Sequence, residues 1–239
     1  CSDELFDSIV EEGSKFAANV LDPLNRVGDK EGAKFENGNV FSPSGFKEAF
    51  KQFSESGWVS LGNDPKWGGQ GLPHVISSQM SEMWNSACMS FCLCPMLTAG
   101  AVMSLSRHGS PEQQEKYLRK LIDGTWSGTM QLTEPQAGSD LSAIRTKAIP
   151  EGDHFLISGT KIYITWGEHD MVDNIIHMVL AKTPGSPEGV KGISLFIVPK
   201  FHVNDDGSLG EKNDISCVSI EHKLGIHGSP TCVMSYGDN

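Results

Sequence analysis

The sequence predicts an α+β protein of two domains: an all-helical domain over residues 1–124 and an antiparallel β-barrel or sandwich over residues 125–239. Two patterns predict this division. Before Gly124, apolar residues recur at spacings of three, four and seven, the period of an amphipathic helix. After Gly124 they alternate or form short β-branched runs between Gly, Pro, Asp and Asn, as closely spaced strands do. A hydrophobic content of 38% over 239 residues allows a sizeable core.

Helices are expected in the first domain over residues 3–21, 45–56, 74–106 and 110–122. We expect the first to end at Pro23, because proline has no N–H to continue the helix. Residues 25–44 are rich in Gly, Asn, Asp and Ser and are expected to form a long connector. Gly57 is expected to close the second helix as its C′ residue. Pro95 is expected to break or kink the third.

Two short segments carry local signals in the helical domain. Ser110-Pro111-Glu112-Gln113 is a strong helix start, with serine as N-cap, proline at N1 and glutamine completing a capping box. The glycine-rich segment 67–73 contains a Gly-x-Gly, but no strand precedes it and Pro73 closes it. We therefore expect a tight turn between helices there, not a dinucleotide-binding loop.

The second domain is expected to be a series of short strands. They span residues 126–133, 143–149, 154–158, 161–165, 172–182, 192–199, 215–222 and 231–236. The loops at 184–191 and 204–213 are rich in Pro, Gly, Asp and Asn and are expected to be exposed. Several short strands at close spacing indicate a closed or sandwiched β domain.

Charge and composition argue against several classes of function. The formal net charge of −11 argues against nucleic-acid binding and against an anionic membrane surface, both of which need a basic patch. No uninterrupted apolar run is long enough to predict a membrane span. The chain begins at Cys1 without a leader-like apolar segment, so we expect a processed or artificial start.

Cysteine and histidine spacing predicts no metal site. The six cysteines form no Cys-x-x-Cys pair and are expected to be reduced and mostly buried. His169-Asp170 and the pair His222 and His227 have no third ligand at a useful spacing. We expect these histidines to be solvated or hydrogen-bonded in loops.

The part of the sequence best suited to binding is a pair of segments, residues 130–140 and 161–167. The first alternates like a strand and then breaks at its Glu-Pro into a small-residue loop, whose N–H groups and hydroxyls can face a ligand. The second is a strand that places its tyrosine and one threonine on one face, because strand side chains repeat with period two. We expect both segments to serve one flat, polar-edged ligand that carries phosphate. The hydroxyl residues expected there are Thr133, Ser139, Tyr163 and Thr165.

These segments read Leu-Thr-Glu-Pro-x-Ala-Gly-Ser-Asp and Lys-Ile-Tyr-Ile-Thr, and they closely resemble the flavin-binding strands of the acyl-CoA dehydrogenase family. Further segments resemble the family in the same order, so the resemblance covers nearly the whole chain. They are residues 110–118, 192–199 and 221–231. Residues 95–101, 128–133 and 167–170 resemble the branch of the family that includes methylmercaptopropionyl-CoA dehydrogenase.

The resemblance implies an FAD site formed by both segments. The cofactor-binding residues that it implies are Met130, Leu132, Thr133, Gly138, Ser139, Tyr163, Ile164 and Thr165. Thr133 is expected at the N1/O2 edge of the flavin ring, where donors stabilise the charge gained on reduction. Thr165 is expected near N5, and Tyr163 where many family members have a tryptophan packed against the flavin. Ser139 is expected at the pyrophosphate.

The resemblance also implies that an acyl-CoA lies between the flavin and the helices. Residues expected near it are Ser139, Pro95, Thr98 and Val102. The family abstracts the α-proton with a glutamate of a C-terminal helical bundle, which we expect to be absent from this chain, so no catalytic residue is expected in it. Glu134 and Asp140 look like an acid–base pair. A Glu-Pro step favours a turn, however, and Asp after Ser favours a cap, so we expect neither to be catalytic.

The leading hypothesis is a fragment of an FAD-dependent acyl-CoA dehydrogenase that oxidises the α,β bond of an acyl-CoA thioester, with 3-methylmercaptopropionyl-CoA as a candidate substrate. The resemblance implies hydride transfer to flavin N5, an electron-transfer flavoprotein as acceptor and a homo-oligomer. It also implies a bacterial cytoplasmic location, with the mitochondrial matrix left open. Two alternatives remain: a non-catalytic or apo flavin-binding and interaction fragment, and an acyl-CoA oxidase or nitroalkane oxidase on the same scaffold.

Overall fold

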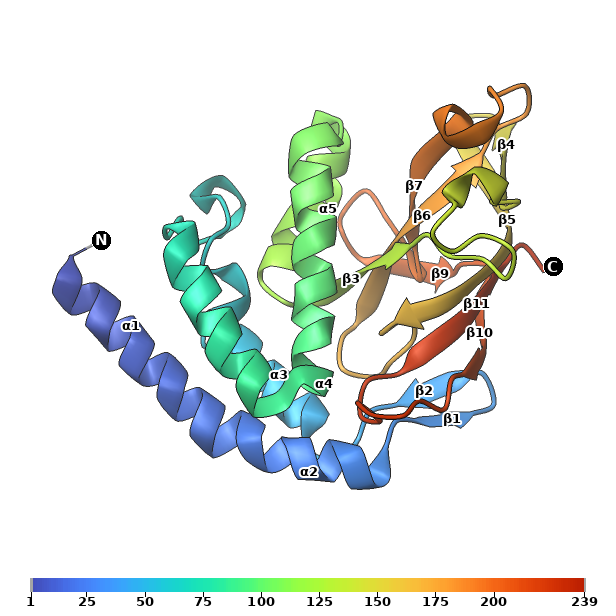
Figure 1. Ribbon diagram of the computed structural model, residues 1–239. Helices are drawn as coiled ribbons and strands as arrows, with labels where there is room; N and C mark the ends of the chain where they lie inside the picture. The colour runs from blue at the N-terminus through green and yellow to red at the C-terminus, as the bar shows by residue number, and fades with distance from the viewer. Residues whose placement is uncertain (1, 239) are drawn as a thin grey trace.

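The chain runs from a helical N-terminal region into a curled β region, as Figure 1 shows for the computed structural model. The structure describes residues 2–238. Helices give way to strands between Ile122 and Trp126, which confirms the predicted order of the two regions. That they are separate domains stays a prediction, because α4 (His74–His108) packs directly on β3 (Trp126–Gln131) across the boundary.

The N-terminal helix continues past Pro23. α1 (Asp3–Phe16) passes through one π-helical turn (Ala17–Leu21) into α2 (Asp22–Glu31). In a π turn each N–H bonds to a carbonyl five residues back instead of four. Pro23 therefore falls in the first turn of α2, where its missing N–H costs little. The prediction that Pro23 ends the helix is wrong for this reason.

Residues 25–44 are also more structured than a connector. α2 occupies them up to Glu31, and a hairpin of β1 (Lys34–Glu36) and β2 (Asn39–Phe41) follows. Its turn is Asn37-Gly38, with φ angles of 50° and 79°. Two positive φ angles are what a two-residue type I′ turn requires, and Asn-Gly is its strongest sequence signal. The prediction of a long connector is wrong, because the end of α2 and this hairpin occupy most of the segment.

The remaining helices follow the prediction except at one break. α3 (Phe46–Glu55) ends before Gly57, which adopts a left-handed φ of 77°, and α5 (Pro111–Ile122) has its predicted capping box. α4 is interrupted at Cys88, whose φ is −153° and ψ 84°, whereas Pro95 keeps helical angles. Of the predicted break or kink at Pro95, the break is therefore wrong, because it lies at Cys88.

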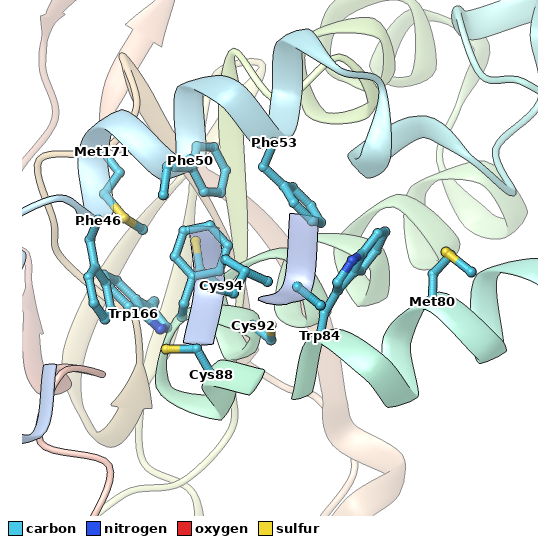
Figure 2. Packing of buried hydrophobic residues seen from close by; sticks show 14 of the residues in the cluster. Phe46, Phe50, Phe53, Met80, Trp84, Cys88, Cys92, Cys94, Trp166 and Met171 are labelled. Atoms are coloured by element: carbon cyan, nitrogen blue, oxygen red, sulfur yellow. The ribbon is translucent and has the colours of Figure 1, made fainter. Parts of the chain in front are cut away.

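Packing against α3 explains the position of the break in α4. Trp84 precedes the break, and its ring lies 4.7 Å from that of Phe53 of α3, centroid to centroid (Figure 2). Phe91 follows the break, and its ring centroid lies 5.8 Å from the same Phe53 ring. Two segments that converge on one aromatic ring need a bend between them. Cys88, with 0% exposure, supplies that bend.

α4 is the one helix among residues 2–238 that is long and apolar enough, by length and composition, to cross a membrane. Half of its most apolar stretch is buried inside the molecule. It contacts α1, α2, α5 and β3, so in this fold it is the central core helix.

The strands of the β region curl beside the helices (Figure 1). After β3 they are β4 (Lys147–Glu151), β5 (His154–Thr165), β6 (Asn174–Lys182), β7 (Ile193–Pro199), β8 (Phe201–Val203), β9 (Leu209–Lys212), β10 (Ile215–Ile220) and β11 (Thr231–Tyr236). The main sheet has the order β10-β11-β5-β4-β6-β3, with β7 also paired to β6. β3 and β6 pair in parallel and the other extended pairs are antiparallel, so the sheet is mixed.

Two strand predictions need correction. The predicted strands 154–158 and 161–165 are one strand, β5, which passes straight through Gly159. The predicted loop 204–213 contains β9, which pairs with β8 in a small hairpin. In both cases the strand is defined by a partner elsewhere in the chain, and local composition carries no information about that partner.

Trp166, directly after β5, joins the two regions. It is 1% exposed and lies in the helical core, stacked on Phe46 with ring centroids 6.3 Å apart (Figure 2). Its indole N–H donates to the Ser90 carbonyl of α4 at 3.1 Å. The end of β5 is therefore anchored to the helices.

Candidate functional site

β5 carries a bulge at the segment identified from the sequence. Two of its residues, Ile162 and Tyr163, lie opposite the single residue Val233 of β11. Lys161 and Ile164, three positions apart, consequently both point inward, with exposures of 0% and 2%. The bulge leaves Tyr163 facing outward, with 60% of its surface exposed.

Tyr163 is also strained. Its φ is 59°, in the left-handed region that costs a bulky residue about 1–2 kcal/mol. Strain of this kind is typical of ligand sites, where the surrounding structure imposes it. An exposed aromatic ring on a strained backbone gains little from its own packing, so Tyr163 is suited to contact a ligand.

The segment after β3 forms a tight turn followed by an open loop. Glu134 and Ala137 exchange backbone hydrogen bonds of 2.9 and 3.0 Å. A Cβ on Gly138 would meet no atom within 4 Å, and Ser139 is exposed. Asp140 accepts the N–H two residues on at 2.9 Å and caps a short 3-10 turn. The turn expected at Glu134 and the cap expected at Asp140 are both present.

The two segments lie side by side. The Ile162 N–H donates to the Thr133 carbonyl at 3.0 Å, and the Lys161 ammonium donates to the Leu132 carbonyl at 3.0 Å. Thr133 therefore neighbours the bulge of β5, as the interpretation of one shared site requires. The hydroxyls of Thr133, Ser139, Tyr163 and Thr165 are among those that make no hydrogen bond within residues 2–238, and none of these four is sealed from solvent.

A buried ion pair lies behind these hydroxyls. Glu134 is 3% exposed and Lys161 0%, and their charged atoms are 2.8 Å apart. Burial raises the pKa of Glu134, but hydrogen bonds from Lys161, Thr146 and the Arg145 N–H outweigh it and hold the pKa at about 2. Burial lowers the pKa of Lys161 despite the attraction of Glu134. A carboxylate so firmly ionised and so fully hydrogen-bonded is a poor proton acceptor.

The predicted substrate residues of α4 lie against β3 and are less open. The Thr98 hydroxyl donates to the Cys94 carbonyl at 3.1 Å and accepts the Gly128 N–H at 3.0 Å. Thr98 and Val102 are 2% and 4% exposed, and Pro95 is half-buried. These contacts hold α4 against β3, and a substrate role for the three residues stays a prediction.

Three of the predicted cofactor residues differ in how much of their side chains is exposed to solvent. Met130 and Leu132 are half-buried, and Met130 packs with the cluster formed by α4, α5, β3 and β6. Ile164 is 2% exposed and packs inside the sheet. Any contact from Ile164 to a ligand must therefore come from its backbone.

A large cavity lies elsewhere. It has a volume of about 1260 Å³ and is formed between the end of α4, α5 and strands β4, β5 and β7, with Tyr236 at its wall. None of the residues predicted to bind cofactor or substrate lines it. The predicted cofactor and substrate residues therefore lie outside this cavity.

Among the histidines considered from the sequence, His169 and His227 are hydrogen-bonded, and His169 is more deeply buried than expected. His169 accepts the Met171 N–H at Nδ1, so its proton is on Nε2, 3.0 Å from the Ser127 hydroxyl. Burial, aided by the charge of Lys200, lowers the pKa of His169 to about 3. The rings of His222 and His227 stack with centroids 5.8 Å apart. Among residues 2–238 no group of three or more His, Cys, Asp or Glu side chains is arranged for a metal ion.

These features define a class: a helical region joined to a mixed β-sheet, with an open hydroxyl-bearing edge where β3 and β5 meet. Residues 5–125 match the profile of the acyl-CoA dehydrogenase N-terminal domain, and residues 129–238 that of the acyl-CoA dehydrogenase middle domain. The chain belongs to the acyl-CoA dehydrogenase family. It is 54% identical over 228 residues to the 3-methylmercaptopropionyl-CoA dehydrogenase of Ruegeria pomeroyi, covering 95% of this chain and 39% of that protein.

Solved structures share the fold. One, from work on the electron transferring flavoprotein of Acidaminococcus fermentans, superposes with a TM-score of 0.80 at 26% identity and covers 100% of this chain and 56% of its own. Another, an acyl-CoA dehydrogenase from Bacillus anthracis complexed with FAD, has a TM-score of 0.78 at 24% identity, covering 99% of this chain and 36% of its own. The chain therefore spans between about a third and a little over half of the proteins it matches.

Proposed function

We propose that this chain forms part of the flavin site of an FAD-dependent acyl-CoA dehydrogenase. The observation that carries the proposal is the pair of adjacent segments, the turn after β3 and the bulge of β5, with four hydroxyls that have no partner within residues 2–238. The FAD complex of the Bacillus anthracis protein, which shares the fold, supports the choice of cofactor.

Each segment has a distinct role toward the cofactor. The Thr133 hydroxyl and nearby N–H groups are suited to donate to the N1/O2 edge of the ring, and Thr165 to contact the N5 side. Gly138, with open space around it, lets the loop approach a diphosphate, and Ser139 adds a donor. Tyr163 provides a face for packing against the ring. When bound, FAD supplies the acceptor for a hydride leaving the β-carbon of the substrate.

The proposed substrate is an acyl-CoA thioester, with 3-methylmercaptopropionyl-CoA as the specific candidate because of the relative in Ruegeria pomeroyi. We assign no catalytic base to this chain. Glu134 is occupied by its hydrogen bonds and Asp140 by its cap. The base, the electron-transfer flavoprotein acceptor and a homo-oligomeric state are proposed for the whole protein, as is a location in the bacterial cytoplasm.

A second function, as a docking module, is favoured by one surface. Met89, Met96 and Met103 are seven residues apart on α4, after its break, and are 49%, 51% and 56% exposed. Side chains at that spacing share one helix face, and exposed methionines suit an adaptable interface. The same face would serve a catalytic protein as the seat for further helices, so docking and catalysis are compatible.

The test of the proposed function is reduction of an artificial electron acceptor by the purified protein that contains this chain, with a panel of saturated acyl-CoAs. Turnover accompanied by bleaching of the flavin absorbance is expected, with 3-methylmercaptopropionyl-CoA among the best substrates. Absence of bound flavin and of turnover with every acyl-CoA would refute it. Stoichiometric peroxide formation in air would instead indicate an oxidase.

A further inference from the structure

One buried carboxylate ties together three separate segments beside the proposed site. Glu134 Oε1 accepts from Lys161 Nζ at 2.8 Å and from the N–H and hydroxyl of Thr146. Its Oε2 accepts from the Arg145 N–H and from Gln136 Nε2, both at 2.6 Å. Every donor comes from the turn, from the start of β4 or from β5. The three segments therefore share a single charged anchor.

Lys161 extends this anchor to both ligand-facing segments. Its ammonium also donates to the Leu132 carbonyl, one residue before Thr133. Along β5, Lys161 is followed directly by the bulge that turns Tyr163 outward at a left-handed φ of 59°. The Ile162 N–H between them donates to the Thr133 carbonyl at 3.0 Å. The ion pair thus lies immediately behind both surfaces.

We propose that the Glu134–Lys161 pair is a positioning element, which sets the separation between Thr133 and the Tyr163–Thr165 bulge that receives the flavin. This inference rests on the proposed function. Neither residue touches the cofactor; they act through the backbone of the turn and of β5. A buried ion pair often stabilises a fold no more than apolar residues of the same shape would. We therefore infer that this pair serves to fix the geometry of the turn and of β5.

The chain offers a matched control. Glu168 and Lys200 form a second ion pair, with side chains 7% and 17% exposed. The Glu168 carboxylate accepts from the His169 N–H and from Lys200, and its hydrogen bonds do not reach the turn after β3. Loss of its charge should cost stability with less effect on the hydrogen bond between Ile162 and Thr133.

The experiment compares Glu134→Gln with Glu168→Gln by amide hydrogen exchange and by FAD titration of the folded protein. Exchange of the Ile162 amide is expressed relative to amides of the β6–β7 ladder, so that general destabilisation cancels. We expect Glu134→Gln to raise this ratio and to weaken FAD binding by at least about tenfold each, since a hydrogen bond to a charged group is worth that factor. Glu168→Gln should change either quantity by less than about threefold.

A second variant keeps the Glu134 carboxylate, so it tests the same role even if Glu134→Gln does not fold. Gln136→Ala removes one donor from an exposed side chain and should shift both quantities in the same direction by about threefold. An unchanged Ile162 ratio in both Glu134→Gln and Gln136→Ala would overturn the positioning role. So would an equal loss of FAD affinity in Glu134→Gln and Glu168→Gln. A wild-type protein that takes up no FAD would count against the proposed function, while the exchange ratio would still decide the positioning role.

Discussion

Two buried polar clusters begin within three residues of each other at the end of β3, and they are built in opposite ways. Around Gln131 the cluster is neutral: the Tyr236 hydroxyl donates to Gln131 Oε1 at 2.5 Å, and the Gln131 amide donates to His177 Nδ1 at 2.7 Å. Around Glu134 it is charged, with Lys161 as the partner. The neutral cluster joins strands inside the sheet, whereas the charged one holds a turn and a bulge.

The difference teaches where strong interactions are needed. Strand β3 is paired to β6 and strand β11 to β5 by backbone ladders, so neutral side-chain bonds suffice to fill the interior between them. The turn at Glu134 and the bulge at Tyr163 have few ladder bonds, and Tyr163 is strained besides. Hydrogen bonds to an ionised group are roughly twice as strong as neutral ones, which suits them to hold such segments.

The largest expected effect comes from breaking the charged cluster. Lys161→Met leaves the buried Glu134 without its cation and should lower the free energy of unfolding by about 3–5 kcal/mol. The double variant Lys161→Met/Glu134→Gln should regain part of that loss, because no lone charge remains. Urea unfolding measures both. A loss below about 1 kcal/mol in the single variant would show that the pair behaves like a surface ion pair.

Acid should lower the stability of the protein in two different pH ranges, one set by buried histidines and the other by the charged cluster. Burial lowers the pKa of His169 and His177 to about 3. Below about pH 6.5 the unfolded chain therefore binds protons at these two side chains, whereas the folded protein does not. Stability should therefore fall as the pH drops from 6.5, by up to roughly 1.4 kcal/mol per pH unit for each histidine. Glu134, with a folded pKa of about 2, loses its contribution only as the pH falls from about 4.5 toward 2.

Urea unfolding at pH 7, 6 and 5 checks the histidine window, with the exposed His154→Gln variant as the control. The control should show the same pH dependence as the wild type. Stability that stays flat between pH 7 and 5 would mean that the buried rings are protonated in the folded protein.

Tyr236→Phe tests the neutral cluster with a smaller expected change. It removes one hydroxyl and leaves Gln131 Oε1 buried without its donor, which should cost about 1–3 kcal/mol. Tyr163→Phe removes the same hydroxyl from an exposed ring and should stay within about 0.5 kcal/mol of the wild type. Thermal melts of the two variants compare them directly. Equal effects would contradict the contrast between a sealed interior and an open site.

The smallest effect should have the opposite sign. Tyr163→Asn places a residue that tolerates the left-handed region at φ 59°, so stability should rise by up to about 1 kcal/mol. FAD binding should weaken in the same variant, because the aromatic face is lost. Denaturant midpoints and flavin titration measure the two effects. A variant that loses stability would show that the Tyr163 backbone is unstrained.

The local pattern was enough to predict a strand that ends just before Thr133, extended structure at Tyr163 and the helical start at Ser110. It could not predict the bulge in β5, which depends on pairing with β11 some seventy residues away, nor the burial of Lys161. The turn at Glu134 was predicted from its Glu-Pro step, but the partners of its carboxylate at Thr146 and Lys161 are set by the fold. The hairpin at Asn37-Gly38, by contrast, is predictable from its Asn-Gly step alone.

The central claim, that the turn after β3 and the bulge of β5 bind one flavin together, is tested most directly by adding FAD to the isotopically labelled protein and mapping backbone amide shifts. The account predicts that Thr133, Gly138, Ser139, Tyr163 and Thr165 shift together and saturate at one concentration. Shifts confined to residues lining the cavity between α5 and β7, such as Tyr117 and Phe196, would contradict it.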